Sequence, residues 1–259
     1  MMEAILQHFR KEEQPFIEMA ASYVREVEDS YTPKLTGFLD PRQQFIIESI
    51  VRSARLSIAG SGAFADAERK RMLIYPDYFV PEPEDFQTKV FSVNYPSKFM
   101  TLKHKDVLGS LMSLGIARSK FGDIRLQDDV VQFAAAEEMK DYLRANFTSI
   151  GKSNVRIEEV HSVDRLIECG DVYVEELHIV SSLRLDAVVA SAVNCSRQKA
   201  ASYIQNEKVK VNHAVRTQTS FELNELDMLS VRGGGRFKIV SIEGRTKKDK
   251  IRLMIGKLS

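Results

Sequence analysis

Two cationic side chains occupy an unusual place, the start of a predicted helix. The helix spans RQKAASYIQ, and Ser196 precedes it as an N-cap whose hydroxyl would accept an amide proton. Arg197 and Lys199 fall in its first turn, where the helix macrodipole is positive and cations cost stability. Free amides, the dipole and two long cationic side chains together suit a phosphate group. The pattern indicates an anion site, and two merely solvated side chains are the plain alternative.

Two further elements position this helix start. An apolar stripe with i, i+3, i+4, i+7 spacing predicts a preceding helix from about Ser182 to Asn194. The stripe consists of Leu185, Val188, Val189 and Ala192. After the second helix, KVKVN alternates, which predicts a half-buried strand with Lys208 and Lys210 on its outer face. Asn212 and His213 would form the following turn, because Asn tolerates left-handed dihedrals.

The order of these residues resembles the S-four RNA-binding domain, a module named after a small-subunit ribosomal protein. The matching run is SxRLDxxxxxxxxxSRxxAxxxIxxxxVxVN, and the segment LDMLSVRG closes it. The flanks IVSSLRLD and SVRGGGRFKI, followed by TKKDKIRL, are similar to the bacterial YlmH family, whose gene is associated with cell-division clusters. Two departures affect turns: Asn206-Glu207 and His213 stand where the domain usually has glycine.

The resemblance implies a protein that binds structured RNA, with ribosomal RNA or tRNA on a ribosomal subunit as its partner. It also implies a ribosome-linked duty such as quality control of stalled large subunits, with a link to cell division. Gly233-Gly234-Gly235 would be a flexible turn that lets RNA approach the backbone. Asn212 is expected to hold its turn more than to read a base. The candidate RNA-binding residues are Arg184, Ser196, Arg197, Lys199, Lys208, Lys210, Asn212, Arg232, Arg236, Lys238, Lys247 and Lys248.

Charge is distributed unevenly along the chain, although the formal total is only +1. From Ser181 onward fifteen Lys and Arg face seven Asp and Glu, a net charge of +8, and the preceding chain carries −7. A basic tail domain on an acidic body points to a polyanionic partner for the basic half. Chance clustering of surface lysines would explain the net charge of this segment, but it would not explain why the cations fall within the S-four-type run.

Composition is that of a globular protein. The 259 residues, 44% of them hydrophobic, suffice for two or three cores of ordinary domain size. No window approaches the about eighteen apolar residues of a membrane span, and Met1 to Arg10 lacks the apolar core of a signal peptide. We therefore expect a cytoplasmic protein with no membrane partner. Cys169 and Cys195 lie far apart and the five histidines lack HxxxH or HExxH spacing, so no metal site and no cofactor are predicted.

The chain is predicted to be an α+β protein in three parts. Residues 1–80 form a mixed α/β domain, with helix over Met1–Val27, a break at Pro15 and a second helix that begins at Pro41 with Phe45, Ile46 and Ile50 inward. The segment PEPEDF marks a boundary. Residues 81–165 read strand, helix, strand, strand, helix, strand, the ferredoxin-like order shared with the RNA recognition motif. Residues 181–259 form the S-four-type domain, and its last two strands would form a basic hairpin or two edge strands.

Whether the ferredoxin-like part touches RNA stays open at this point. Phe91 and Phe133 lie on candidate central strands, where an RNA recognition motif places its stacking aromatics. The glycine-aromatic signature of that motif is missing, so a scaffold is the alternative. DVYVEELHIV alternates like a strand and would extend one of the sheets.

Catalysis is not predicted. Arg184-Leu185-Asp186 superficially resembles the catalytic aspartate segment of pseudouridine synthases, which also carry S-four domains. Asp186, however, would stabilise the start of the first helix, with Arg184 facing outward, and no second catalytic pattern surrounds it. The prediction is a non-enzymatic RNA-binding protein. Two alternatives are a protein-interaction factor of the division machinery, which would use the acidic Met1–Val180 body, and an RNA-modifying enzyme with acids in a deep cleft.

Overall fold

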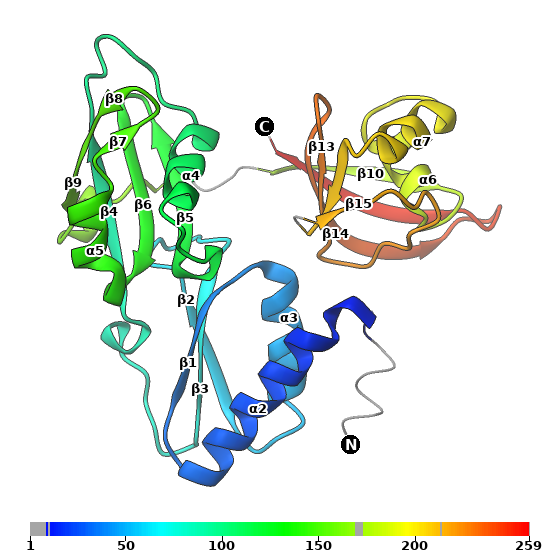
Figure 1. The fold of residues 1–259 in the computed structure, drawn as a ribbon. Helices are drawn as coiled ribbons and strands as arrows, with labels where there is room; N and C mark the ends of the chain where they lie inside the picture. Colours follow the sequence, from blue (N-terminus) through cyan, green and yellow to red (C-terminus); the bar gives the residue numbers. More distant parts are fainter. Residues whose placement is uncertain (1–8, 10, 169–172, 213, 259) are drawn as a thin grey trace. The chain divides into compact units, whose positions relative to one another are not determined.

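The computed structural model describes residues 9, 11–168, 173–212 and 214–258. The chain divides into two compact units, Met1–Gly170 and Asp171–Ser259, and each is described by itself. No helix among these described residues is long and apolar enough to cross a bilayer. The predicted α+β class is confirmed, since helices and strands are mixed along both units (Figure 1).

The first part of unit one packs two helices on a three-stranded antiparallel sheet. After η1 (Lys11–Glu13), the helices are α2 (Gln14–Ser30) and α3 (Pro41–Val51). The strands, in the sheet order β1-β3-β2, are β1 (Lys34–Leu39), β2 (Ser57–Ser61) and β3 (Lys70–Tyr75). Figure 1 shows both helices beside this small sheet.

Helix α3 begins where the sequence predicts. Pro41 is its first residue, and the Asp40 carboxylate accepts a hydrogen bond from the Gln43 amide at 2.9 Å. The Gln43 side chain accepts from the Asp40 amide in return, which completes a capping box. The inward face contains Ile46 and Ile50 as expected. Phe45 was expected inward and is 41% exposed, because the buried stripe runs through Ile46, Ile47 and Ile50.

The second part of unit one has the predicted order of strands and helices. Its sheet has the order β5-β6-β4-β9 with antiparallel neighbours, the split βαβ arrangement of ferredoxin-like folds. The elements are η2 (Pro83–Phe86), β4 (Thr88–Asn94), α4 (His104–Ser113), η3 (Arg118–Lys120), β5 (Phe121–Gln127), β6 (Val130–Ala136), η4 (Glu137–Met139), α5 (Lys140–Asn146) and β9 (Arg156–Glu159). A short hairpin of β7 (Ser149–Ile150) and β8 (Ser153–Asn154) is added before β9, and η5 (Val163–Arg165) follows it.

Neither face of this sheet offers the aromatic platform of an RNA recognition motif. Phe91 and Phe133 are fully buried, and their ring centroids lie 5.5 Å apart inside the core that the helices cover. On the opposite face, Val90 packs in a buried cluster with Phe38 and Phe64 from the preceding part of the chain. Of the two alternatives left open for this sheet, base stacking on Phe91 and Phe133 is excluded, because both rings are buried in the core.

The segment after β9 covers the same opposite face further along. Gln132 is buried on β6, and its side-chain amide donates to the Arg165 carbonyl at 2.8 Å and accepts from the Ile167 amide at 2.9 Å. Asp123 ties the early part of the unit to β5, because its carboxylate accepts from the amides of Glu68 and Arg69. The two parts of unit one therefore share buried contacts, and a domain boundary near residue 80 stays a prediction.

Unit two is a six-stranded antiparallel sheet with two helices. The strands follow the order β10-β15-β14-β13-β11-β12. Its elements are β10 (Tyr173–Val180), α6 (Leu185–Ala192), α7 (Arg197–Gln205), β11 (Val209–Val211), β12 (Ala214–Val215), β13 (Met228–Val231), β14 (Gly235–Arg245) and β15 (Ile251–Leu258). The predicted helix, helix, strand order is confirmed, although α6 is shorter at both ends than Ser182–Asn194.

The strand pattern after the module differs from the prediction in one respect. β14 and β15 form the predicted hairpin, but β15 lies inside the sheet because β10 pairs with all eight of its residues. The same pairing confirms that YVEELHIV extends a sheet, with β10 as an edge strand. Asp171 and Val172, the first two residues of the predicted segment, lie outside the described residues.

The two turns that depart from the glycine pattern adopt left-handed backbone conformations. Glu207 has φ +57° and Asn212 has φ +48°, values that glycine adopts without steric cost. The Glu207 position therefore keeps the turn that a glycine would make, with strain. His213 lies outside the described residues.

Candidate nucleic-acid interface

The start of α6 is held by main-chain atoms of a distant segment. The Leu185 amide donates to the Phe221 carbonyl at 2.7 Å, and the Asp186 amide donates to the Thr219 carbonyl at 3.1 Å. These bonds satisfy amides that a side-chain cap would otherwise take. These main-chain hydrogen bonds hold the backbone of Arg184 and Asp186 in place independently of their side chains.

The Asp186 carboxylate gathers two arginines. Arg197 Nε lies 2.9 Å from Oδ2 and Nη2 lies 3.2 Å from Oδ1, and Arg184 binds the same carboxylate through Nε at 3.2 Å and Nη2 at 3.3 Å. The Asp186 side chain is only 9% exposed, whereas those of Arg184 and Arg197 are 41% and 51% exposed. The carboxylate therefore orients two guanidinium groups whose outer edges face solvent.

The pKa values agree with this arrangement. Burial raises the pKa of Asp186, and hydrogen bonds from Arg197 and Arg184 more than offset it, so the net shift of the pKa is downward. The hydrogen bond to Asp186 raises the pKa of Arg197. Both shifts favour the ionised forms, the carboxylate of Asp186 and the guanidinium of Arg197. Arg184 was expected to face outward; its side chain is 41% exposed, and it is also paired with Asp186.

A second gathering of cations surrounds Tyr203. The Lys199 and Lys208 ammonium groups lie 5.9 Å and 5.7 Å from the centroid of the Tyr203 ring, within cation–π range. The Arg232 amide donates to the Lys208 carbonyl at 2.8 Å, which brings the β13–β14 turn to the same place. Ser196 caps α7 as predicted, since its hydroxyl oxygen accepts from the Lys199 amide at 3.2 Å.

These contacts form two groups of cations that share helix α7: Arg184 and Arg197 at Asp186, and Lys199 and Lys208 at Tyr203, with the backbone of Arg232 beside the second group. We call Arg184, Arg197, Lys199, Lys208 and Arg232 the helix-side cluster. Lys199, Lys208 and Arg232 are exposed, and no ion pair joins them to a carboxylate in the described part of the chain. The cluster therefore presents more positive charge than its one internal carboxylate neutralises.

Three other predicted residues lie on the opposite face of the sheet. Val209 and Val211 face the core with the helices, so Lys210 between them points away from the helices. Lys210 is opposite Ser230, which is opposite Arg236, and Lys238 follows on the same side of β14. The structure therefore separates these outer-face cations from the helix-side cluster.

Lys247 and Lys248 are further removed. They lie in the tight turn between β14 and β15, at the far end of β14 from the Arg232 turn. β14 has eleven residues, so at about 3.3 Å per residue the two ends are roughly 35 Å apart. One compact site cannot include both ends.

Asn212 is occupied inside the unit. Its side-chain nitrogen donates to Asp227 Oδ1 at 2.8 Å, and its oxygen accepts from the Met228 amide at 2.9 Å. Asp227 is fully buried and also accepts from the Asn224 amide at 2.8 Å. The side chain of Asn212 holds the turn, which is the role that the sequence favoured over base reading.

Sequence reasoning missed two contributors to the helix-side cluster. Tyr203 was not among the predicted binding residues, and Asp186 was assigned only to a helix start. A signal for Tyr203 exists, because it follows Lys199 by four residues and such residues are neighbours on a helix. No local signal joins Asp186 to Arg197, since that contact depends on how α6 and α7 cross.

Two family models match the chain, one over the ferredoxin-like part of unit one and one over the helices and the strands β11 and β12 of unit two. Residues 81–164 match the family model "Putative RNA-binding domain in YlmH", and residues 183–229 match the S4 domain, the S-four module. The second match contains four of the five cations of the helix-side cluster.

Two relatives extend the similarity beyond single domains. The chain is 43% identical over 252 residues to "Ribosome-associated protein quality control protein P2" of Bacillus subtilis (strain 168), covering 97% of this chain and 98% of that protein. It is also similar to a solved structure, "Cell division protein ylmH from Streptococcus pneumoniae", with 33% identity and a TM-score of 0.55. That similarity covers 62% of this chain and 98% of the solved one. Because identity this high extends over nearly the whole chain, the protein belongs to the YlmH family.

Proposed function

We propose that this protein is a non-enzymatic RNA-binding protein that docks its helix-side cluster on structured RNA of a ribosomal particle, either ribosomal RNA or tRNA. The observation that carries the proposal is that two groups of cations, one at Asp186 and one at Tyr203, share helix α7 within the S4 match, with Arg232 beside them. The name of the B. subtilis relative supports the ribosomal partner. That partner would place the protein in the cytoplasm, and the proposal requires no metal ion or cofactor.

The geometry favours recognition by shape and phosphate contacts. Asp186 holds two guanidinium forks in fixed directions, and a fork matches the paired oxygens of a phosphate. A-form RNA hides its base edges in a deep groove, so a surface of this kind would follow the backbone. Binding by several phosphate contacts should weaken steeply as salt concentration rises.

The proposed duty is ribosome-associated quality control, by analogy with the B. subtilis relative. A second candidate is a protein-interaction factor of the division machinery, favoured by the name of the S. pneumoniae relative and by the net charge of −7 before Ser181. Nuclease treatment of a lysate separates the two candidates. Loss of the large complexes after treatment supports the RNA partner, and survival of those complexes supports the division partner.

The direct test uses charge reversals that avoid the Asp186 ion pairs. Lys199→Glu/Lys208→Glu alters two exposed cations beside Tyr203 and should abolish cosedimentation with ribosomal particles. Lys247→Glu/Lys248→Glu carries the same charge change at the distant turn and should retain most of the binding. Circular dichroism and thermal unfolding of both variants check the fold. Equal losses in the two variants would show that net charge, and not the helix-side cluster, determines binding.

A further inference from the structure

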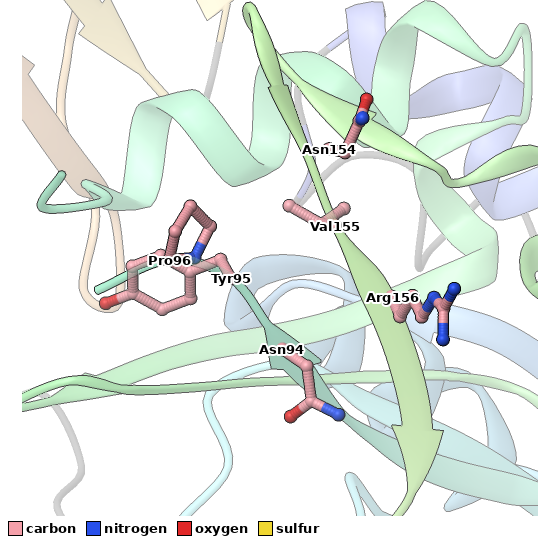
Figure 2. Close-up of a pocket in the computed structure, with 6 residues that line it drawn as sticks. All are labelled: Asn94, Tyr95, Pro96, Asn154, Val155 and Arg156. Carbon is pink, nitrogen blue, oxygen red and sulfur yellow. The ribbon is translucent and has the colours of Figure 1, made fainter. Parts of the chain in front are cut away.

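One end of the ferredoxin-like sheet carries a hollow beside an aromatic ring. The hollow has a volume of about 380 Å³ and is lined by Asn94, Tyr95, Pro96, Asn154, Val155 and Arg156. Figure 2 shows the Tyr95 ring on the β4 side and the Arg156 guanidinium on the β9 side. Asn94 and Arg156 are directly paired across these two strands, so the sheet fixes their separation. Tyr95 and Val155 lie on the side of the sheet that faces the helices, whereas Asn94 and Arg156 lie on the other side, so groups from both sides of the sheet bound the hollow at this end.

A second hollow lies between the start of α4 and the β7–β8 hairpin. Its volume is about 500 Å³, and its lining includes Lys105 from α4 and Lys152 from the hairpin. Gly151 has φ +60° in the tight hairpin turn. Both hollows are made by residues 94–110 and 150–156, so they lie at the same end of the sheet.

The loop between β4 and α4 adds a second aromatic ring. Phe99 is 89% exposed, and its backbone is held by a hydrogen bond from its amide to the Pro96 carbonyl at 3.0 Å. A single exposed aromatic residue is ordinary on a protein surface. Phe99, however, follows the exposed Lys98 in the loop that lines both hollows. An exposed ring and a cation therefore lie together beside two hollows.

Several exposed cations gather at this end. Lys98, Lys105, Lys152 and Arg156 are exposed, and none of them forms an ion pair within the described ranges of the chain. The acids at or beside this end include Asp106, Asp128, Asp129 and Glu158.

Two of these acids already have identifiable interactions. Asp106 accepts a hydrogen bond from the Lys103 amide at 3.0 Å. Burial raises the pKa of Tyr95, with a smaller contribution from the charge of Asp129, so the phenol stays neutral. Because the four cations are exposed and form no ion pair with these acids in the described residues, they remain available to an external anion.

We propose that this end of the sheet binds an unpaired segment of RNA. Bases would stack on Phe99 and Tyr95, and phosphates would contact Lys98, Lys105, Lys152 and Arg156. Single-stranded nucleic acids are held in this way, by aromatic rings that stack on bases and cations that follow the backbone. The inference deepens the proposed function, on which it rests, by giving the ferredoxin-like part its own class of RNA.

Two other ligands fit the same surface less well. A duplex keeps its bases stacked internally and offers nothing to Phe99 or Tyr95. An acidic peptide would neutralise the cations but would leave both rings without flat partners. Stacking on the buried Phe91 and Phe133 is already excluded for the residues that the structure describes, and this end carries the exposed ring of Phe99 instead.

The test exploits the absence of tryptophan from the chain. Phe99→Trp places a single fluorescent reporter at the exposed loop position in the full-length protein. Titration with a ten-nucleotide uridine oligomer should quench its emission to a plateau, because a stacked base quenches indole. Val80→Trp, at a position that is 80% exposed outside this end, should show no quenching.

Charge variants in the Phe99→Trp background locate the phosphate contacts. Lys152→Ala/Arg156→Ala should weaken the apparent affinity for the oligomer on the order of tenfold at low salt. Arg52→Ala/Arg55→Ala removes the same charge from exposed positions elsewhere and should leave the affinity unchanged. An equal loss in both variants overturns the assigned site.

The outcomes also separate this inference from the proposed function. Lys199→Glu/Lys208→Glu in the same background should lose ribosomal particles but keep the quenching. Absence of quenching, or equal quenching by a fully paired stem, overturns the inference and leaves the helix-side cluster untouched. Quenching by polyglutamate and not by the oligomer overturns it in favour of an acidic protein partner.

Discussion

Replacing Asn212 distinguishes a structural residue from a base reader. In Asn212→Ala, Asp227 loses the donor at 2.8 Å and the Met228 amide loses the acceptor at 2.9 Å. Both partners are buried, and each buried group left without a partner costs about 1–3 kcal/mol. Asp227 keeps the Asn224 amide, so the lower half of that range applies to it.

The backbone adds a further cost. Asn212 has φ +48°, and alanine in the left-handed region is less favourable by roughly 1 kcal/mol. Together the terms give about 3–6 kcal/mol, or a fall in melting temperature of at least roughly 12 °C for a unit of this size. Asn212→Gly removes the same hydrogen bonds without the backbone strain, so it should be more stable than Asn212→Ala by about 1 kcal/mol.

Calorimetry and urea unfolding give the free energies, and hydrogen exchange of the peptide that contains Met228 locates the change. Cosedimentation with ribosomal particles, measured well below the melting temperature, should be unaffected in both variants. If Asn212→Ala retains wild-type stability and loses RNA binding, the reasoning is wrong and Asn212 contacts RNA.

Three further substitutions test other parts of unit two. Glu207→Gly should raise the free energy of unfolding by about 1 kcal/mol, because glycine takes φ +57° without strain, and Glu207→Ala should give no gain in urea unfolding. Burial lowers the pKa of His178, and the charge of Glu176 opposes this with a smaller upward effect. The unfolded chain therefore binds the proton more readily, so the free energy of unfolding should fall as the pH drops below 6.5. His178→Gln should flatten this pH dependence, as measured by unfolding at pH 5.5 and 7.5. Asp186→Asn should weaken binding to ribosomal particles on the order of tenfold, because both guanidinium groups lose the carboxylate that orients them. The substitution also adds net positive charge, so a gain in affinity across a salt series would show that charge outweighs geometry.

Local sequence determined the parts of this fold that depend on near neighbours. The apolar stripe of α6, the Ser196 cap of α7 and the alternation of β11 were all readable, because helical and strand periods act over a few residues. The capped start of α3 at Pro41 was readable for the same reason. These features identified the positions of the cations along the chain, and with them the resemblance to an RNA-binding module.

Tertiary structure decided which cations meet. Strand pairing placed Lys210 on the face opposite the helices, and the packing of α6 on α7 joined Arg197 to Asp186 across eleven residues of sequence. Packing also buried Phe91 and Phe133, which a strand pattern alone left available to bases. Sequence periodicity says which residues share one side of an element, whereas the partner that covers that side is chosen by contacts between residues far apart in the chain. For this reason the sequence could name a basic RNA-binding module, and only the folded chain could show that its cations form separate surfaces.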